Sequence, residues 1–118
     1  MEAFEDLDVW KRSVHLAVEI HRSLKGCREY SLKEQIMRSA ISISSNIAEG
    51  FERNSNKQFA QFLYIAKGSC GELRSQLRIC LETGLLEADR VKYFISEAGE
   101  ISKMIYGLIS HCRRNFDD

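Results

Sequence analysis

The chain has 118 residues, of which 44% are hydrophobic and 29% are charged, and its formal net charge is zero. These values are typical of one globular domain and argue against a disordered chain, and no apolar run reaches the ~18 residues that a membrane span needs. The acidic start of the chain lacks the basic and apolar regions of a signal peptide. We therefore expect a single cytoplasmic domain over residues 1–118.

The absence of proline, with most glycines placed between apolar segments, predicts an all-helical chain. The first helix is expected over residues 8–25, with Asp8 as its N-cap and Gly26 just after its end. Residues spaced by three and four positions predict its core-facing side: Trp10, Val14, Ala17, His21 and Leu24. A second apolar stripe lies beside that side and consists of Val9, Leu16 and Ile20.

The second helix is expected over residues 31–49, because Ser31 and Glu34 form a capping-box pattern and Gly50 follows its end. Its core-facing side is predicted to consist of Ile36, Ala40, Ile43 and Ile47. An adjoining face of apolar and small side chains consists of Met37, Ile41, Ser44 and Ala48. Since an additional apolar face favours a partner, we expect this face to mediate self-association. The alternative is that this helix is the most buried helix of a monomer.

The third helix is expected over residues 55–83, with a second capping box at Ser55 and Gln58, and the fourth over residues 89–114, with Asp89 as its cap. The predicted core-facing residues of the third helix are Phe59, Phe62, Leu63, Ala66, Cys70, Leu73, Leu77 and Cys80. Those of the fourth helix are Val91, Phe94, Ala98, Ile101, Ile105, Leu108 and Cys112.

Connections of about five residues favour antiparallel neighbours, so the expected fold is an antiparallel up-down-up-down four-helix bundle. At 1.5 Å per residue the third helix is roughly 42 Å long and the first about 26 Å. The hairpin of the third and fourth helices is therefore expected to project past the other pair.

Three segments carry a recognisable pattern: LDVWKRSVHLAVEIH, LKEQIMRSAISISSNIAEGFERNSNKQFAQFLYIAKGSCGELRSQL and ISKMIYGLI. They resemble the bacterial four-helix-bundle family typified by the 23S rRNA intervening-sequence proteins, although Ser45 stands where that family often has proline. The accessory variability determinant proteins of diversity-generating retroelements are a related branch. The resemblance implies a ring-like homopentamer. In the retroelement branch it also implies a basic surface that binds nucleic acid and a reverse transcriptase.

Basic side chains on the third helix are the first candidate for a nucleic-acid site. Lys67, Arg74 and Arg78 share one helical row with Gly71, where phosphates could be neutralised and a backbone could approach closely. The second candidate combines the start of the first helix with the end of the fourth: Lys11, Arg12, Arg113 and Arg114. The alternative for both groups is a solvated helix border whose side chains cover apolar neighbours.

The corner after the second helix carries the family pattern at Asn46, Glu49, Gly50 and Arg53. There, Asn46 could cap carbonyl groups, and Glu49 could pair with Arg53 or with Arg38 of a neighbouring chain. A structural corner explains these residues more simply than a binding site.

Sequence motifs for catalysis are absent. The chain has no phosphate-binding loop, nucleophile elbow, Glu-x-x-His carboxylate pattern or Cys-x-x-Cys pair. We therefore expect no enzyme activity, cofactor, metal or small-molecule substrate, and structural, reduced cysteines. The leading hypothesis is a homo-oligomeric helical module that binds RNA or a nucleic-acid-processing protein. The alternative is a protein-binding scaffold with no nucleic-acid role.

Overall fold

A computed structural model describes residues 3–115 of the chain. Within this range the elements are a 3-10 helix, η1 (Phe4–Asp6), and the α-helices α1 (Asp8–Ser23), α2 (Tyr30–Glu52), α3 (Asn56–Thr83) and α4 (Ala88–Arg113). The described residues contain no strand, so the all-helical prediction is confirmed for them. The molecule is elongated and measures 48 × 21 × 19 Å.

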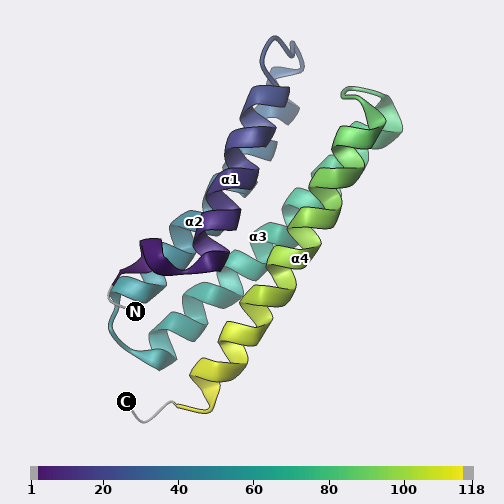
Figure 1. Ribbon diagram of the computed structural model, residues 1–118. Helices are drawn as coiled ribbons and strands as arrows, with labels where there is room; N and C mark the ends of the chain where they lie inside the picture. The colour runs from purple at the N-terminus through teal and green to yellow at the C-terminus, as the bar shows by residue number, and fades with distance from the viewer. Residues whose placement is uncertain (1–2, 116–118) are drawn as a thin grey trace.

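The helices are arranged as two neighbouring pairs. Figure 1 shows α1 beside α2 and α3 beside α4, with the α1–α2 and α3–α4 connections both at the upper end of the view. The two pairs contact each other because α2 packs on α3 and α1 packs on α4. The most extensive contacts are those of α3 with α4 and α2, and α3 is also the longest helix at 28 residues. The core therefore centres on α3.

The core-facing sides of α2, α3 and α4 follow the predicted spacing. All four predicted residues of α2 are at most 1% exposed, and α3 buries the predicted residues from Leu63 to Cys80. Phe59, Phe62 and Leu108 are only half-buried, and Ile109 takes the buried place next to Leu108. Sustained three- and four-residue spacing of large apolar side chains thus identified the buried faces of these helices.

The predicted core side of α1 is wrong by about one residue. The buried residues of α1 are Val9, Ser13, Leu16 and Ile20, whereas Trp10, Val14 and Ala17 are half-buried and His21 is exposed. Of the five predicted residues, Leu24 at the C-cap is buried as expected, at 0% exposed. Ser13 can lie in the core because its hydroxyl donates to the Val9 carbonyl at 2.7 Å. Trp10 is instead packed edge-on against Phe4 of η1, with ring centroids 5.2 Å apart. The stripe of Val9, Leu16 and Ile20, which was expected to lie beside the core-facing side of α1, is therefore its core-facing side.

Several helix ends differ from the predicted ones. The N-caps of α1, α2 and α4 are Leu7, Glu29 and Glu87, so Asp8, Ser31 and Asp89 lie inside their helices. The Glu87 carboxylate accepts from the backbone amides of Asp89 and Arg90, at 3.2 and 3.1 Å. Glu87 therefore caps α4 in the place predicted for Asp89. The end of α2 lies beyond Gly50, at Glu52. Gly26 and Gly84 do follow helix ends with φ of 82° and 68°, where glycine avoids a steric cost.

The Ser55 cap gives a matched stability test. Its hydroxyl accepts from the Gln58 backbone amide at 3.3 Å, so Ser55→Ala is expected to lower the free energy of unfolding by ~1 kcal/mol. Ser31→Ala is the control, and because Ser31 is exposed inside α2 it should change stability by less than about 0.5 kcal/mol. Urea denaturation of both variants measures the difference. Equal losses would contradict the observed start of α2.

Candidate functional site

The basic row of α3 lies between its buried stripe and Tyr64, which contacts Arg113 of α4, so by helical phase the row borders α4. Lys67 is half-buried, whereas Arg74 and Arg78 are exposed. The Arg78 guanidinium pairs with the Glu82 carboxylate one turn later at 3.2 Å, and this pair is solvent-exposed. An exposed pair of this kind is weak, so Arg78 can exchange its partner at little cost.

The buried thiol of Cys70 lies beneath this row. Burial raises its pKa to about 12, and the positive charges of Arg74 and Lys67 oppose that shift. Cys70 lies three residues after Lys67 and four residues before Arg74, which is about one helical turn from each. A thiol that stays protonated at neutral pH is a poor nucleophile, so Cys70 acts as a small core residue.

Arg12 is occupied by a contact within the protomer. Its guanidinium donates to both carboxylate oxygens of Glu97 at 2.9 and 2.6 Å, and to the Met104 sulfur at 3.3 Å. The hydrogen bond to Glu97 raises the Arg12 pKa and lowers that of Glu97. Two parallel N–H···O bonds fix both side chains, so Arg12 ties α1 to α4 and is a poor candidate for phosphate binding.

The second predicted basic group is divided between two places. Arg12 contacts Met104, which precedes Arg113 by nine residues, or about 13 Å along α4. The structure therefore does not bring Lys11 and Arg12 together with Arg113 and Arg114, because α4 extends past the start of α1. Arg113 instead donates to the Tyr64 hydroxyl of α3 at 3.1 Å. Lys11 and Arg114 are exposed.

The Arg12–Glu97 pair predicts a pH-dependent contribution to stability. Since the pKa of Glu97 is lowered from 4.5 on folding, the contribution is present above pH 4.5 and is lost as the pH falls through the folded-state pKa. Wild type should exceed Glu97→Gln in free energy of unfolding at pH 7, and the difference should shrink at pH 3. Denaturant titrations at both pH values measure this difference. Glu34→Gln is the control, because Glu34 belongs to a solvent-exposed ion pair with Arg38. A constant difference would show that the ion pair contributes nothing.

The predicted self-association face of α2 is only partly open. Met37, Ser44 and Ala48 are half-buried, and Ile41 is 51% exposed. The Ser44 hydroxyl donates to the Ile41 carbonyl at 3.3 Å within the helix. Ile41 is therefore the large apolar side chain that this face leaves to solvent.

The family-pattern corner joins α2 to α3. Glu49 pairs with Arg53 at 2.8 Å, which is the first of the two predicted partners, and Arg38 pairs with Glu34. The Arg53 guanidinium also lies over the Phe62 ring, 4.9 Å from its centroid. Gly50 is buried inside α2, and a Cβ added there would lie 2.6 Å from the Phe62 Cβ. Gly50 therefore permits close approach of the two helices, and the prediction that it ends the helix is wrong.

Asn46 does not cap the corner. Its amide donates to the carbonyl and the hydroxyl of Ser42, both at 2.9 Å, and the Ser42 hydroxyl lies 2.8 Å from that of Ser69 on α3. Ser69 also donates to the Ile65 carbonyl at 3.2 Å, and Ser39 is 5% exposed. The small polar residues of α2 thus pack against α3 within the protomer. Their spacing at positions 39, 42 and 46 was the signal available in the sequence.

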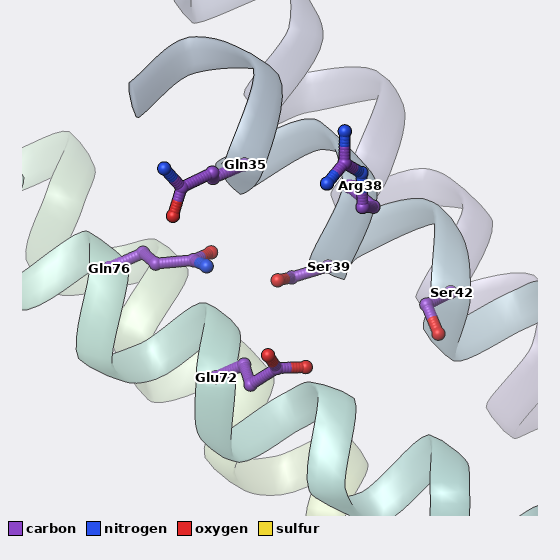
Figure 2. Close-up of a pocket in the computed structure, with 6 residues that line it drawn as sticks. All are labelled: Gln35, Arg38, Ser39, Ser42, Glu72 and Gln76. Carbon is purple, nitrogen blue, oxygen red and sulfur yellow. The ribbon is translucent and has the colours of Figure 1, made fainter. Parts of the chain in front are cut away.

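A polar cavity of about 340 Å³ lies between α2 and α3. Figure 2 shows four side chains from α2 and two from α3 around it: Gln35, Arg38, Ser39, Ser42, Glu72 and Gln76. The Gln76 Oε1 atom is buried and accepts no hydrogen bond from the residues that the structure describes. This mixture of donors and acceptors can hold water or a small polar group. The periodicity of a single helix does not predict this cavity, because its lining residues come from two helices.

The histidines are dispersed over the surface. His15 contacts Glu19 at 3.1 Å on α1, and His21 and His111 are exposed. Among residues 3–115, no group of three His, Cys, Asp or Glu residues could hold a metal ion. In the same range, no helix has the length and apolarity that crossing a bilayer would take.

Comparison with known proteins gives the relationship of this chain. It is similar to the crystal structure of a protein of unknown function from the S23 ribosomal protein family of Bacteroides thetaiotaomicron, with 27% identity and a TM-score of 0.80. The alignment covers 86% of this chain and 97% of that one. No curated protein matches the chain. Residues 5–107 match the family described as 23S rRNA-intervening sequence protein, and the chain belongs to this family.

Proposed function

We propose that this chain is a non-enzymatic, cytoplasmic helical module that binds RNA along the basic border of α3. The observation that carries the proposal is the row of Lys67, Arg74 and Arg78, which borders α4. Within residues 3–115, Lys67 and Arg74 form no ion pair, so their charges are available to phosphates. Contacts between such cations and a polyanion are favoured by counterion release.

RNA is the proposed polyanion because the family description refers to 23S rRNA. The resemblance to the accessory variability determinant proteins, which bind nucleic acid through a basic surface, supports the same class of ligand. The zero net charge of the chain does not oppose this, since binding depends on the local charge of the border rather than on the total.

An electrophoretic mobility shift with labelled single-stranded RNA over a salt series tests the proposal. A shift is expected at 50 mM salt, and it should weaken steeply towards 200 mM because salt opposes counterion release. The absence of a shift at 50 mM would overturn the proposal. It would favour the second candidate, a protein-binding scaffold, for which the exposed Ile65 and Ile79 on α3 are the supporting observation.

The proposed module is a homo-oligomer of antiparallel bundles, with a homopentameric ring implied by the resemblance. The α2 face around Ile41 supports this, because its other members are already half-buried and Ile41 is 51% exposed. Closure of that face by a second protomer would remove an exposed apolar side chain from water.

Ile41→Glu is expected to dissociate the assembly without unfolding the protomer. A carboxylate buried unpaired at a subunit interface is costly, whereas one on an open helix surface changes stability by less than about 0.5 kcal/mol. Light scattering measures the mass and circular dichroism the helicity. Val18→Glu is the control, because Val18 is exposed on α1. A wild type that scatters as a 13.6 kDa monomer would contradict the oligomer.

A further inference from the structure

The outer face of the α3–α4 hairpin carries the same kind of row on each helix. Both rows repeat every seven residues, close to two helical turns, so each stays on one side of its helix with a drift of about 20° per step. Each contains a cation at both ends, one tyrosine and one glycine. The α3 row is Lys57, Tyr64, Gly71 and Arg78, and the α4 row is Lys92, Gly99, Tyr106 and Arg113.

The two rows are in register. Arg78 lies five residues before the end of α3 at Thr83, and Lys92 lies four residues after the start of α4 at Ala88. Each further step of seven residues moves about 10.5 Å away from the connection along either helix. Figure 1 shows α3 and α4 side by side over this length. The resulting levels are Arg78 with Lys92, Gly71 with Gly99, Tyr64 with Tyr106, and Lys57 with Arg113.

A hydrogen bond joins the rows across the hairpin. The Arg113 guanidinium donates to the Tyr64 hydroxyl at 3.1 Å, so both rows lie on the same side of the hairpin. Tyr64 is 48% exposed and Tyr106 is 59% exposed, which leaves ring surface open to solvent at one level. Lys67 and Arg74, seven residues apart on α3, lie on the α4-facing side of the first row.

The glycines leave backbone uncovered between the tyrosine level and the upper cations. A Cβ added to Gly71 or Gly99 would have no neighbour within 4 Å, so packing inside the protomer does not require glycine there. Glycine inside a helix lowers helix stability relative to alanine. Both positions are therefore suited to close approach of something outside the protomer.

We infer that this face binds single-stranded RNA, with unpaired bases stacked on Tyr64 and Tyr106 and phosphates held by the cations at either end. The inference rests on the proposed RNA-binding function and names its substrate class. Aromatic rings favour unpaired bases, because the faces of duplex bases are already stacked on one another. Four cations match a polyanion, and one of them, Arg78, would exchange its exposed and weak pair with Glu82 for a phosphate.

Charge argues against a two-fold contact in which two copies of the chain meet through this same face. Two copies meeting through it would bring the cationic levels, Lys57 with Arg113 and Arg78 with Lys92, against cations of the same kind. Like charges facing one another across an interface are unfavourable. RNA removes that conflict because every nucleotide brings a negative phosphate.

Fluorescence anisotropy with a labelled 20-nucleotide oligouridine and a 20-base-pair RNA duplex tests the inference. The variants are Tyr64→Leu with Tyr106→Leu, which removes both rings, and Tyr64→Phe with Tyr106→Phe, which keeps them. Tyr30→Leu is the control, because Tyr30 is 69% exposed at the start of α2. Circular dichroism melting checks that each variant is folded.

Wild type should bind the oligouridine more tightly than the duplex. The double leucine variant should bind oligouridine at least tenfold more weakly, with duplex affinity within twofold of wild type. The phenylalanine and Tyr30→Leu variants should stay within threefold for both. Equal wild-type affinity for both RNAs, equal losses for both, or dissociation of the protein assembly by the leucine variant would overturn the base-stacking face alone. Failure of wild type to bind either RNA would overturn the proposed function as well.

Discussion

Leu73→Ala and Ile105→Ala are each expected to lower the free energy of unfolding by about 2–5 kcal/mol. Both side chains are 0% exposed, on the two helices that make the most extensive contact. The loss combines the transfer free energy of the deleted methyl groups with the cost of the cavity that rigid neighbours leave open. Urea or thermal denaturation followed by circular dichroism measures it.

Ile79→Ala is the matched control for the core substitutions. Ile79 lies on the same helix as Leu73 but is 48% exposed, so the same deletion should change stability by less than about 0.5 kcal/mol. A loss at Ile79 equal to that at Leu73 would show that the outer face of α3 is buried in solution. A neutral Leu73→Ala would contradict the assigned helix phase.

Gly50→Ala is expected to destabilise the protein by about 1–3 kcal/mol, although alanine favours a helix. The new Cβ would lie 2.6 Å from the Phe62 Cβ and 3.3 Å from the Phe59 carbonyl oxygen, so α2 and α3 would have to separate. Overpacking of this kind outweighs the ~1 kcal/mol that alanine gains over glycine in a helix. Thermal denaturation of the variant measures the net change.

Gly68→Ala is the control, because it is expected to change stability in the opposite direction. A Cβ at Gly68 would meet nothing within 4 Å, so only the helix preference remains and stability should rise by about 0.5–1 kcal/mol. If both alanines stabilised the protein, the close approach at Gly50 would be wrong. If both destabilised it, the outer face of α3 would be in contact with another chain.

Periodicity located the buried faces of three helices because each has one dominant stripe of large apolar side chains. In α2, Ile36, Ile43 and Ile47 are too large and too regularly spaced to be placed elsewhere. In α1, two adjoining stripes have similar hydrophobicity, and Trp10 belongs to the stripe that does not form the core. The deciding facts, a hydrogen-bonded Ser13 in the core and a Trp10 covered by Phe4, depend on tertiary contacts.

The polar residues of α2 show a second limit of sequence reasoning. The sequence predicts that Asn46 could cap carbonyl groups at the corner, and it predicts no partner for Ser42. In the structure the Ser42 hydroxyl lies 2.8 Å from that of Ser69, 27 residues further along the chain, and Asn46 donates to the Ser42 hydroxyl. Pairs of this kind depend on helix register, which single-helix periodicity does not contain.

For the same reason, the sequence located one of the two candidate basic groups and not the other. The row of Lys67 and Arg74 needs only the periodicity of one helix, and both side chains lie on one border as expected. Grouping Arg12 with Arg113 required the relative positions of α1 and α4 along the bundle axis. The contacts of Arg12 with Glu97 and Met104 show that the start of α1 lies beside the middle of α4 and not beside its end. Local patterns were therefore reliable where a surface belongs to one helix.

The salt dependence of RNA affinity tests whether the α3 border binds RNA. Two triple variants are compared with wild type. The α3 variant carries Lys67→Gln, Arg74→Gln and Arg78→Gln. The charge-matched control carries Arg22→Gln, Lys25→Gln and Arg28→Gln, which are exposed at the connected end of the α1–α2 pair. For single strands each lost phosphate contact reduces the slope of log affinity against log salt by about 0.7. The slope should be about two units shallower for the α3 variant and unchanged for the control. Equal slopes in all three proteins would contradict RNA binding by the α3 border.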